Sequence, residues 1–185
     1  MNKKFSYLKY LYKYSVQYFF KLIYGKIIYK NSPKKSIKDS IKKIQSDSIR
    51  KLNGDYYYVY NISKGRIFTD YVENVAIINK NNILSNSSYQ QVAGRLKNAK
   101  FNSVLYKGTP RFKKKIDGNV LSLIQGASGH SNYFHWLFDI LPKINLFSSI
   151  YNLKKIDYLY LSEIKNFQSR SLKILNLDKI KIIDA

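Results

Sequence analysis

The sequence contains no cysteine, only 3 prolines and only 11 acidic residues among 185. The absence of cysteine excludes disulfide bonds and cysteine-ligated metals, and it fits the reducing environment of the cytoplasm. No run of about 18 apolar residues is present, so nothing in the sequence is typical of a transmembrane span. A Walker loop, a complete Gly-x-Gly-x-x-Gly pattern, a Ser–His–carboxylate order and an Asp-x-Asp motif are also absent.

The charge is strongly one-sided, because 33 Lys and Arg residues face those few acids and give a formal net charge of +22. Such a balance is typical of proteins that bind nucleic acids or anionic membranes. A compositional bias toward Lys, Ile, Asn and Tyr explains it equally well, since the lysines are spread along the whole chain rather than gathered in one patch. We therefore do not favour nucleic acid as a partner. The hydrophobic content of 45% predicts a globular protein.

Residues 1–53 are expected to form a basic helical lead-in. Lysines alternate with aromatic and aliphatic residues over 3–30 at helical spacing, which predicts a basic amphipathic helix. Such a helix can make peripheral contact with an anionic membrane, or it can pack on the body of the protein. A second helix is predicted from Ser32-Pro33, with an apolar stripe that includes Ile41 and Ile44, to Asn53-Gly54.

Residues 54–117 are expected to form a small β-rich segment, because short β-prone runs alternate there with Asn, Ser, Gly and Lys. A hairpin turn is predicted at Lys80-Asn81-Asn82, since Asn tolerates left-handed backbone geometry. The predicted strands are Tyr56–Ile62, Val75–Ile78, Ile83-Leu84 and Ser103–Tyr106.

Residues 118–185 alternate regularly between strand and helix patterns, which predicts an α/β fold with a parallel sheet. The strand Gly118–Ile124 is followed by a glycine loop and by a helix that Ser131 or Asn132 can cap. Pro142 would clash with the carbonyl of Phe138, so this helix is expected to kink or stop near Leu141. The later elements are a strand at Ile156–Leu161, a helix at Phe167–Leu175 and a strand at Ile180–Ile183.

The helix after the glycine loop carries the most promising polar residues. His135 and Asp139 are four residues apart and therefore share a face, where the carboxylate can orient the imidazole and either group can act as a general base. A plain contact on the helix surface has the same spacing. Together with His130 the two could also ligate a metal. Trp136 can stack on a ligand ring or pack in the core.

The segment Asn132–Pro142, NYFHWLFDILP, resembles the Asn-Tyr-(Tyr/Phe)-His-Trp-Leu-x-(Glu/Asp)-x-Leu-Pro signature of glycosyltransferase family 61, which includes capsular polysaccharide biosynthesis proteins. The resemblance extends over roughly Val75 to Ala185, including the strands on both sides of the signature and the element Phe167–Leu172. It implies a GT-B fold, in which two Rossmann-like domains face each other across a cleft. It also implies inverting transfer of a sugar, as hexosyl or pentosyl, from a nucleotide-sugar co-substrate to a glycan acceptor, with no metal or other cofactor.

The resemblance also implies roles for individual residues. Asp139, or His135 supported by it, would be the catalytic base that deprotonates the acceptor hydroxyl. The residues expected to bind substrate or to shape the loop beside the cleft are Asn132, Gly126, Gly129, Trp136 and His130.

The family's second half, with its donor-binding basic residues, has no counterpart in the sequence. We therefore expect the chain to be the Rossmann-like N-terminal half of such an enzyme, completed by a missing C-terminal domain or a separately encoded half. Such a half can be inactive alone. The expected location is the bacterial cytoplasm, at the inner face of the membrane. The alternative function is a non-catalytic basic module that binds anionic membrane or nucleic acid through its N-terminal residues.

Overall fold

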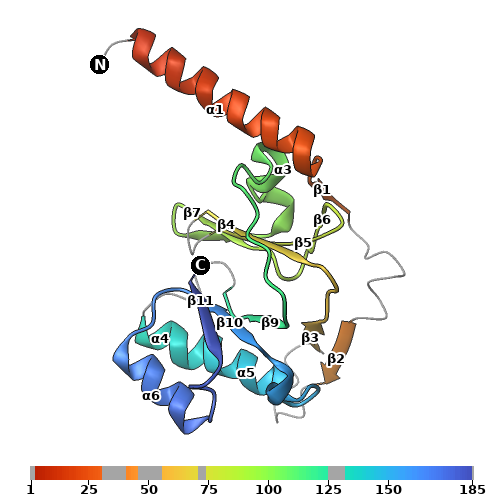
Figure 1. Ribbon diagram of the computed structural model, residues 1–185, viewed down its shortest axis with the longest axis vertical. Coiled ribbons are helices and arrows are strands. Elements are labelled where there is room, and N and C mark those ends of the chain that lie inside the picture. The colour runs from red at the N-terminus through yellow and green to blue at the C-terminus, as the bar shows by residue number, and fades with distance from the viewer. Residues whose placement is uncertain (1–2, 31–40, 46–55, 71–73, 125–131, 185) are drawn as a thin grey trace.

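The computed structural model describes residues 3–30, 41–45, 56–70, 74–124 and 132–184. These residues form a mixed α/β structure (Figure 1). A long N-terminal helix lies at one end of the longest axis and a parallel sheet with its helices lies at the other, with short antiparallel strands between them. The α/β class predicted from the sequence is confirmed.

Helix α1 (Lys3–Tyr24) projects from the rest of the molecule (Figure 1). It is attached by its last turn, where the Phe20 ring is buried and its centroid lies 5.1 Å from that of Phe112. Lys113 lies over the Tyr24 ring, with its Nζ 3.9 Å from the centroid. The helix ends at Gly25, whose left-handed φ of 79° lets its N–H bond to the carbonyl of Lys21. The predicted helix is therefore confirmed, but it ends before residue 30.

A four-stranded sheet follows, in the order β1-β6-β5-β4. Its strands are β1 (Ile28–Tyr29), β4 (Arg66–Thr69), β5 (Val75–Asn79) and β6 (Asn82–Ile83). β5 pairs antiparallel with both β4 and β6, while β1 joins β6 in parallel. The predicted turn is confirmed, because Lys80 and Asn81 adopt left-handed φ values of 44° and 64° between β5 and β6.

The second helix predicted from the sequence is wrong over Ile41–Gln45, which is strand β2. β2 pairs antiparallel with β3 (Tyr56–Tyr60), so a partner distant in sequence decides its conformation. The apolar spacing of an isolated segment cannot reveal such a partner. The remainder of that predicted helix lies outside the described residues.

The strand predicted at Ser103–Tyr106 is also wrong, because α3 (Val104–Lys107) begins there. The side chain of Asn102 accepts a hydrogen bond from the N–H of Val104 at 3.1 Å, which satisfies a donor at the start of the helix. A 3₁₀ turn, η1 (Ala99–Phe101), precedes it. A hairpin of β7 (Gln90–Val92) and β8 (Arg95–Lys97), which the sequence did not indicate, completes this part of the chain.

The C-terminal part is a three-stranded parallel sheet in the order β11-β10-β9, as the alternating pattern predicts. Its strands are β9 (Val120–Ser122), β10 (Tyr158–Leu161) and β11 (Lys181–Asp184). The helical elements between them are α4 (Tyr133–His135), η2 (Trp136–Ile140), α5 (Leu141–Ser148), η3 (Leu153–Lys155) and α6 (Asn166–Ile174).

One hydrophobic core joins this sheet to its helices. Trp136, Ile140 and Leu172 from the helices pack with Leu159 and Leu161 from β10, and all are almost completely buried. On the alternate residue of β10, the hydroxyl of Tyr160 bonds to Thr69 Oγ1 of β4 at 2.7 Å. The parallel sheet is thus packed on helices on one side and tied to the β-rich part on the other.

Candidate active site

The candidate site is built where β9 leads into α4. Asn132 has extended backbone geometry and its Oδ1 accepts a hydrogen bond from the N–H of Phe134 at 2.8 Å, so it caps the helix as predicted. The glycine loop between β9 and α4 lies outside the described residues. The roles predicted for Gly126, Gly129 and His130 therefore remain predictions.

A π-helical turn separates α4 from α5, so the disturbance expected near Leu141 is a widened turn and not a stop. Pro142 has no N–H, and its ring crowds the carbonyl of Phe138. The chain accommodates this by widening one turn, in which the N–H of Leu141 bonds to the carbonyl of Trp136, five residues earlier. The helix then continues as α5. Single π-helical turns inside α-helices are frequent at functional sites.

His135 and Asp139 are brought together on this widened turn. Nδ1 of His135 lies 2.6 Å from Oδ2 of Asp139, and the side chains remain 33% and 39% exposed. The carboxylate can only accept, so Nδ1 carries the hydrogen and Nε2 is left as the lone-pair nitrogen of the neutral ring. The pair therefore presents a base nitrogen, oriented by a carboxylate, at a partly exposed position.

Exposed aromatic rings flank the pair, and the sequence analysis had not singled them out. Phe134 lies edge-on to the His135 ring at 5.7 Å, and Phe138 lies 4.8 Å from Phe134. Both phenylalanines are more than 60% exposed. A ligand that covers such exposed rings gains binding free energy, because apolar surface is removed from water. The flat face of a sugar ring can cover them in this way. The four-residue spacing of the two phenylalanines indicates, from the sequence alone, that they share a helix face.

Lys143 continues the same helix face and is a further residue that the sequence analysis missed. It is partly buried, and its Nζ donates a hydrogen bond to the carbonyl of Leu123, just beyond β9, at 3.0 Å. Burial lowers its pKa from the ordinary 10.5 to about 8, while the nearby carboxylate of Asp139 acts in the opposite direction. Ionisable groups perturbed in this way gather at functional sites.

Trp136 lies in the core rather than beside the imidazole. Its side chain is completely buried, and its ring meets that of Phe167 edge-on at 6.5 Å. Its Nε1 has no hydrogen-bond partner among the described residues. The structure thus assigns Trp136 to the packing role, one of the two that its sequence context allowed.

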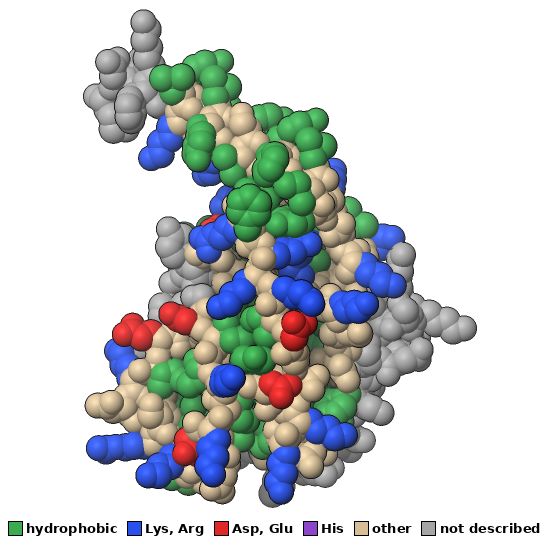
Figure 2. All heavy atoms as spheres, in the orientation of Figure 1, with side chains coloured by type: hydrophobic (Ala, Val, Ile, Leu, Met, Phe, Trp, Pro, Cys, Tyr) green, Lys and Arg blue, Asp and Glu red, His purple; other side chains and the backbone are tan. Residues whose placement is uncertain are grey.

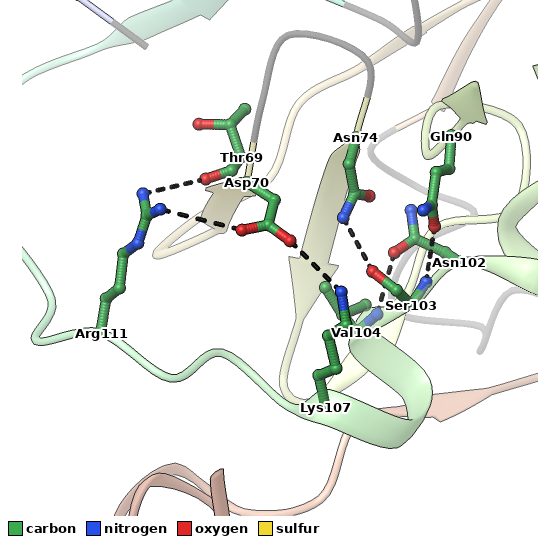
Figure 3. Close-up of polar contacts among 9 residues, drawn as sticks. All are labelled: Thr69, Asp70, Asn74, Gln90, Asn102, Ser103, Val104, Lys107 and Arg111. Atoms are coloured by element: carbon green, nitrogen blue, oxygen red, sulfur yellow. Dashed lines mark hydrogen bonds and ion pairs between the residues drawn. The ribbon is translucent and has the colours of Figure 1, made fainter. Parts of the chain in front are cut away.

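A second polar cluster lies between β5 and α3 (Figure 3). Asn74 donates to Ser103 Oγ at 2.9 Å, and Gln90 accepts from the N–H of Ser103 at 2.8 Å. Beside them, Asp70 forms ion pairs with Lys107 at 3.5 Å and with Arg111 at 3.8 Å (Figure 3). These contacts join neighbouring segments of the β-rich part to one another, so we interpret the cluster as structural.

No group of three or more His, Asp or Glu side chains with metal-binding geometry occurs among the residues that the structure describes. Likewise, none of the helices described has both the length and the apolar character needed to cross a bilayer. Comparisons with known proteins do not assign a family: no family model matches the sequence, and no curated protein or solved structure matches it significantly.

Proposed function

We propose that the chain belongs to a nucleotide-sugar-dependent, inverting glycosyltransferase of cell-surface polysaccharide synthesis and that it supplies the base for the acceptor. The hydrogen bond of 2.6 Å between His135 and Asp139 is the observation that carries the proposal. The likeness of the segment 132–142 to the family 61 signature supplies the reaction class. The parallel sheet with its helices is compatible with the Rossmann-like half of a GT-B enzyme, which is the finer fold that we propose.

In the proposed reaction, the acceptor hydroxyl loses its proton to Nε2 of His135 while its oxygen attacks the anomeric carbon of the donor. The new glycosidic bond forms as the bond from that carbon to the phosphate oxygen breaks, and the nucleotide leaves with the electron pair. Asp139 stabilises the imidazolium that results, and the proton then passes to solvent. A base positioned in this way typically contributes 10²- to 10⁴-fold to the rate.

The groups around the pair support this assignment. Phe134 and Phe138 expose rings on which an acceptor sugar can pack. Lys143 places a positive charge near Asp139. We propose a cytoplasmic location, which the absence of cysteine fits.

The test is made in the source cell, so that the protein keeps whatever partners it has. The chromosomal codons are changed to give Asp139→Asn or His135→Gln, and the surface polysaccharide is quantified with its sugar composition. Both variants are expected to lose the sugar that the enzyme adds. Because the two side chains are 33% and 39% exposed, the amount of folded protein is expected to stay constant on immunoblots.

Asp178→Asn is the matched control, since it makes the same chemical change at an exposed turn residue between α6 and β11. This variant is expected to keep normal polysaccharide. Wild-type polysaccharide in the Asp139→Asn strain, with the protein present at its usual level, would contradict the proposed function.

A further inference from the structure

The N-terminal helix carries a large apolar surface that the rest of the molecule does not cover. Only residues on one side of α1 contact the body: Phe20 is buried, while Val16 and Tyr24 are partly buried. The apolar side chains on the remaining surface are each 41% or more exposed. They are Tyr7, Leu8, Tyr10, Leu11, Tyr12, Tyr14, Tyr18, Phe19, Leu22 and Ile23.

Part of this exposed surface forms an apolar stripe, which Ser15 interrupts between Leu11 and Tyr18. Leu8, Leu11, Tyr18 and Leu22 follow one another at spacings of three, seven and four residues, so they share the side of the helix that faces away from the body. Figure 2 shows apolar side chains gathered along the visible face of α1. A monomeric protein rarely exposes so many contiguous apolar side chains without a partner for them.

The charge of the helix indicates which partner it meets. α1 contains no acidic residue, and Lys9, Lys13 and Lys21 lie on other sides of the helix than the stripe. Figure 2 shows further basic side chains on the body next to the helix. Lys113 is at the attached end, where its Nζ lies over the Tyr24 ring. Pairing with a second copy would bring together two chains of formal net charge +22, and α1 has no acidic residue to offset their repulsion.

An anionic lipid surface complements both features. The leucines of the stripe can enter the boundary between headgroups and acyl chains, and tyrosines can sit at the level of the headgroups. The excess positive charge of the helix and the body attracts anionic lipids to the protein. Because the helix is too polar to cross a bilayer, it would lie in the interface rather than span it. We propose that α1 docks the protein on an anionic membrane surface through the stripe of Leu8, Leu11, Tyr18 and Leu22. This proposal does not depend on the chemistry of His135.

The test is co-sedimentation of the full chain with vesicles of phosphatidylcholine alone or with one-third phosphatidylglycerol. The variant L11S/L22S removes apolar surface from the stripe without changing charge. Its control, L96S/L175S, makes the same changes at two leucines that are exposed on the body. Circular dichroism verifies that all three proteins contain the same amount of helix.

The wild-type chain is expected to bind the anionic vesicles, to bind the neutral ones much more weakly, and to lose affinity as salt rises. The variant L11S/L22S should bind about tenfold more weakly or worse, since two apolar side chains no longer enter the interface, while the control should bind normally. Unchanged binding by L11S/L22S would overturn the proposal, because the net positive charge of the protein would then be enough to explain its binding to anionic vesicles. The proposal would also be overturned if the chain did not bind the vesicles but bound RNA. The same holds if the chain did not bind the vesicles but formed a dimer that L11S/L22S abolished.

Discussion

Replacing Lys143 by methionine should stabilise the protein at neutral pH. The pKa of Lys143 is lowered from 10.5 to about 8, chiefly by burial, so the folded state carries a penalty for the charged form. One pKa unit corresponds to about 1.4 kcal/mol, which makes this penalty about 3 kcal/mol. Methionine fills a similar volume without charge but gives up the hydrogen bond to the Leu123 carbonyl, worth about 1 kcal/mol. The expected net gain at pH 7 is about 2 kcal/mol.

The pH dependence identifies the cause of this gain. Between pH 8 and pH 10.5 the unfolded chain binds more protons at Lys143 than the folded chain does, so this residue makes wild-type stability rise with pH across that window. Below pH 8 the lysine is protonated in both states and the full penalty applies. The advantage of Lys143→Met should therefore be largest at pH 7 and smaller at pH 9.5.

Urea and thermal unfolding followed by circular dichroism at pH 7 and pH 9.5 measure both effects. A gain of about 2 kcal/mol raises Tm by about 4 to 8 °C in a chain of this size. Lys173→Met is the control, because Lys173 is exposed on α6, and it should change stability by less than about 0.5 kcal/mol. If Lys143→Met lowered stability at pH 7, or if its effect were the same at both pH values, the assigned burial penalty would be wrong.

Two further substitutions test the structure around the site. Asn132→Ala removes the bond to the Phe134 N–H and should cost about 1 kcal/mol in urea unfolding, whereas Asn132→Asp, which keeps the cap, should cost less; equal losses would refute the capping role. Gly118→Ala should destabilise more than Gly94→Ala: both glycines have left-handed φ, of 139° and 72°, but only at Gly118 would the added Cβ lie 2.9 Å from Oδ2 of Asp157. Equal effects of the two alanines in the same unfolding assay would show that this contact is relieved at little cost.

The parallel part of the fold could be predicted because its signals are local. The short apolar runs at β9, β10 and β11 are separated by helical patterns. That alternation is typical of parallel strands joined by crossover helices. The cap at Asn132 and the approach of His135 to Asp139 are likewise fixed by residues within one or two turns.

The remaining features depend on partners that are distant in sequence or on context that patterns do not carry. Strand β2 follows its pairing with β3 rather than its own apolar spacing. The bond from Asn102 to the backbone overrides the β-prone residues at the start of α3. The burial of Lys143 could not be foreseen, because lysine is almost always exposed and only the packed helix shows where its side chain reaches. The sequence predicts that Pro142 disturbs the helix near Leu141, but it does not show that a π-helical turn accommodates the proline.

The most direct test of the catalytic role of His135 and Asp139 is the initial rate of sugar transfer by membranes combined with the cytosol of cells that lack only this gene, so that a separately encoded half is present. Purified wild-type or Asp139→Asn protein is added with labelled nucleotide sugars, and the label in the lipid-linked or polymeric acceptor is followed with time. The proposed base predicts that the variant binds these membranes normally but transfers sugar at least about 100-fold more slowly. A variant rate within twofold of the wild-type rate would contradict it.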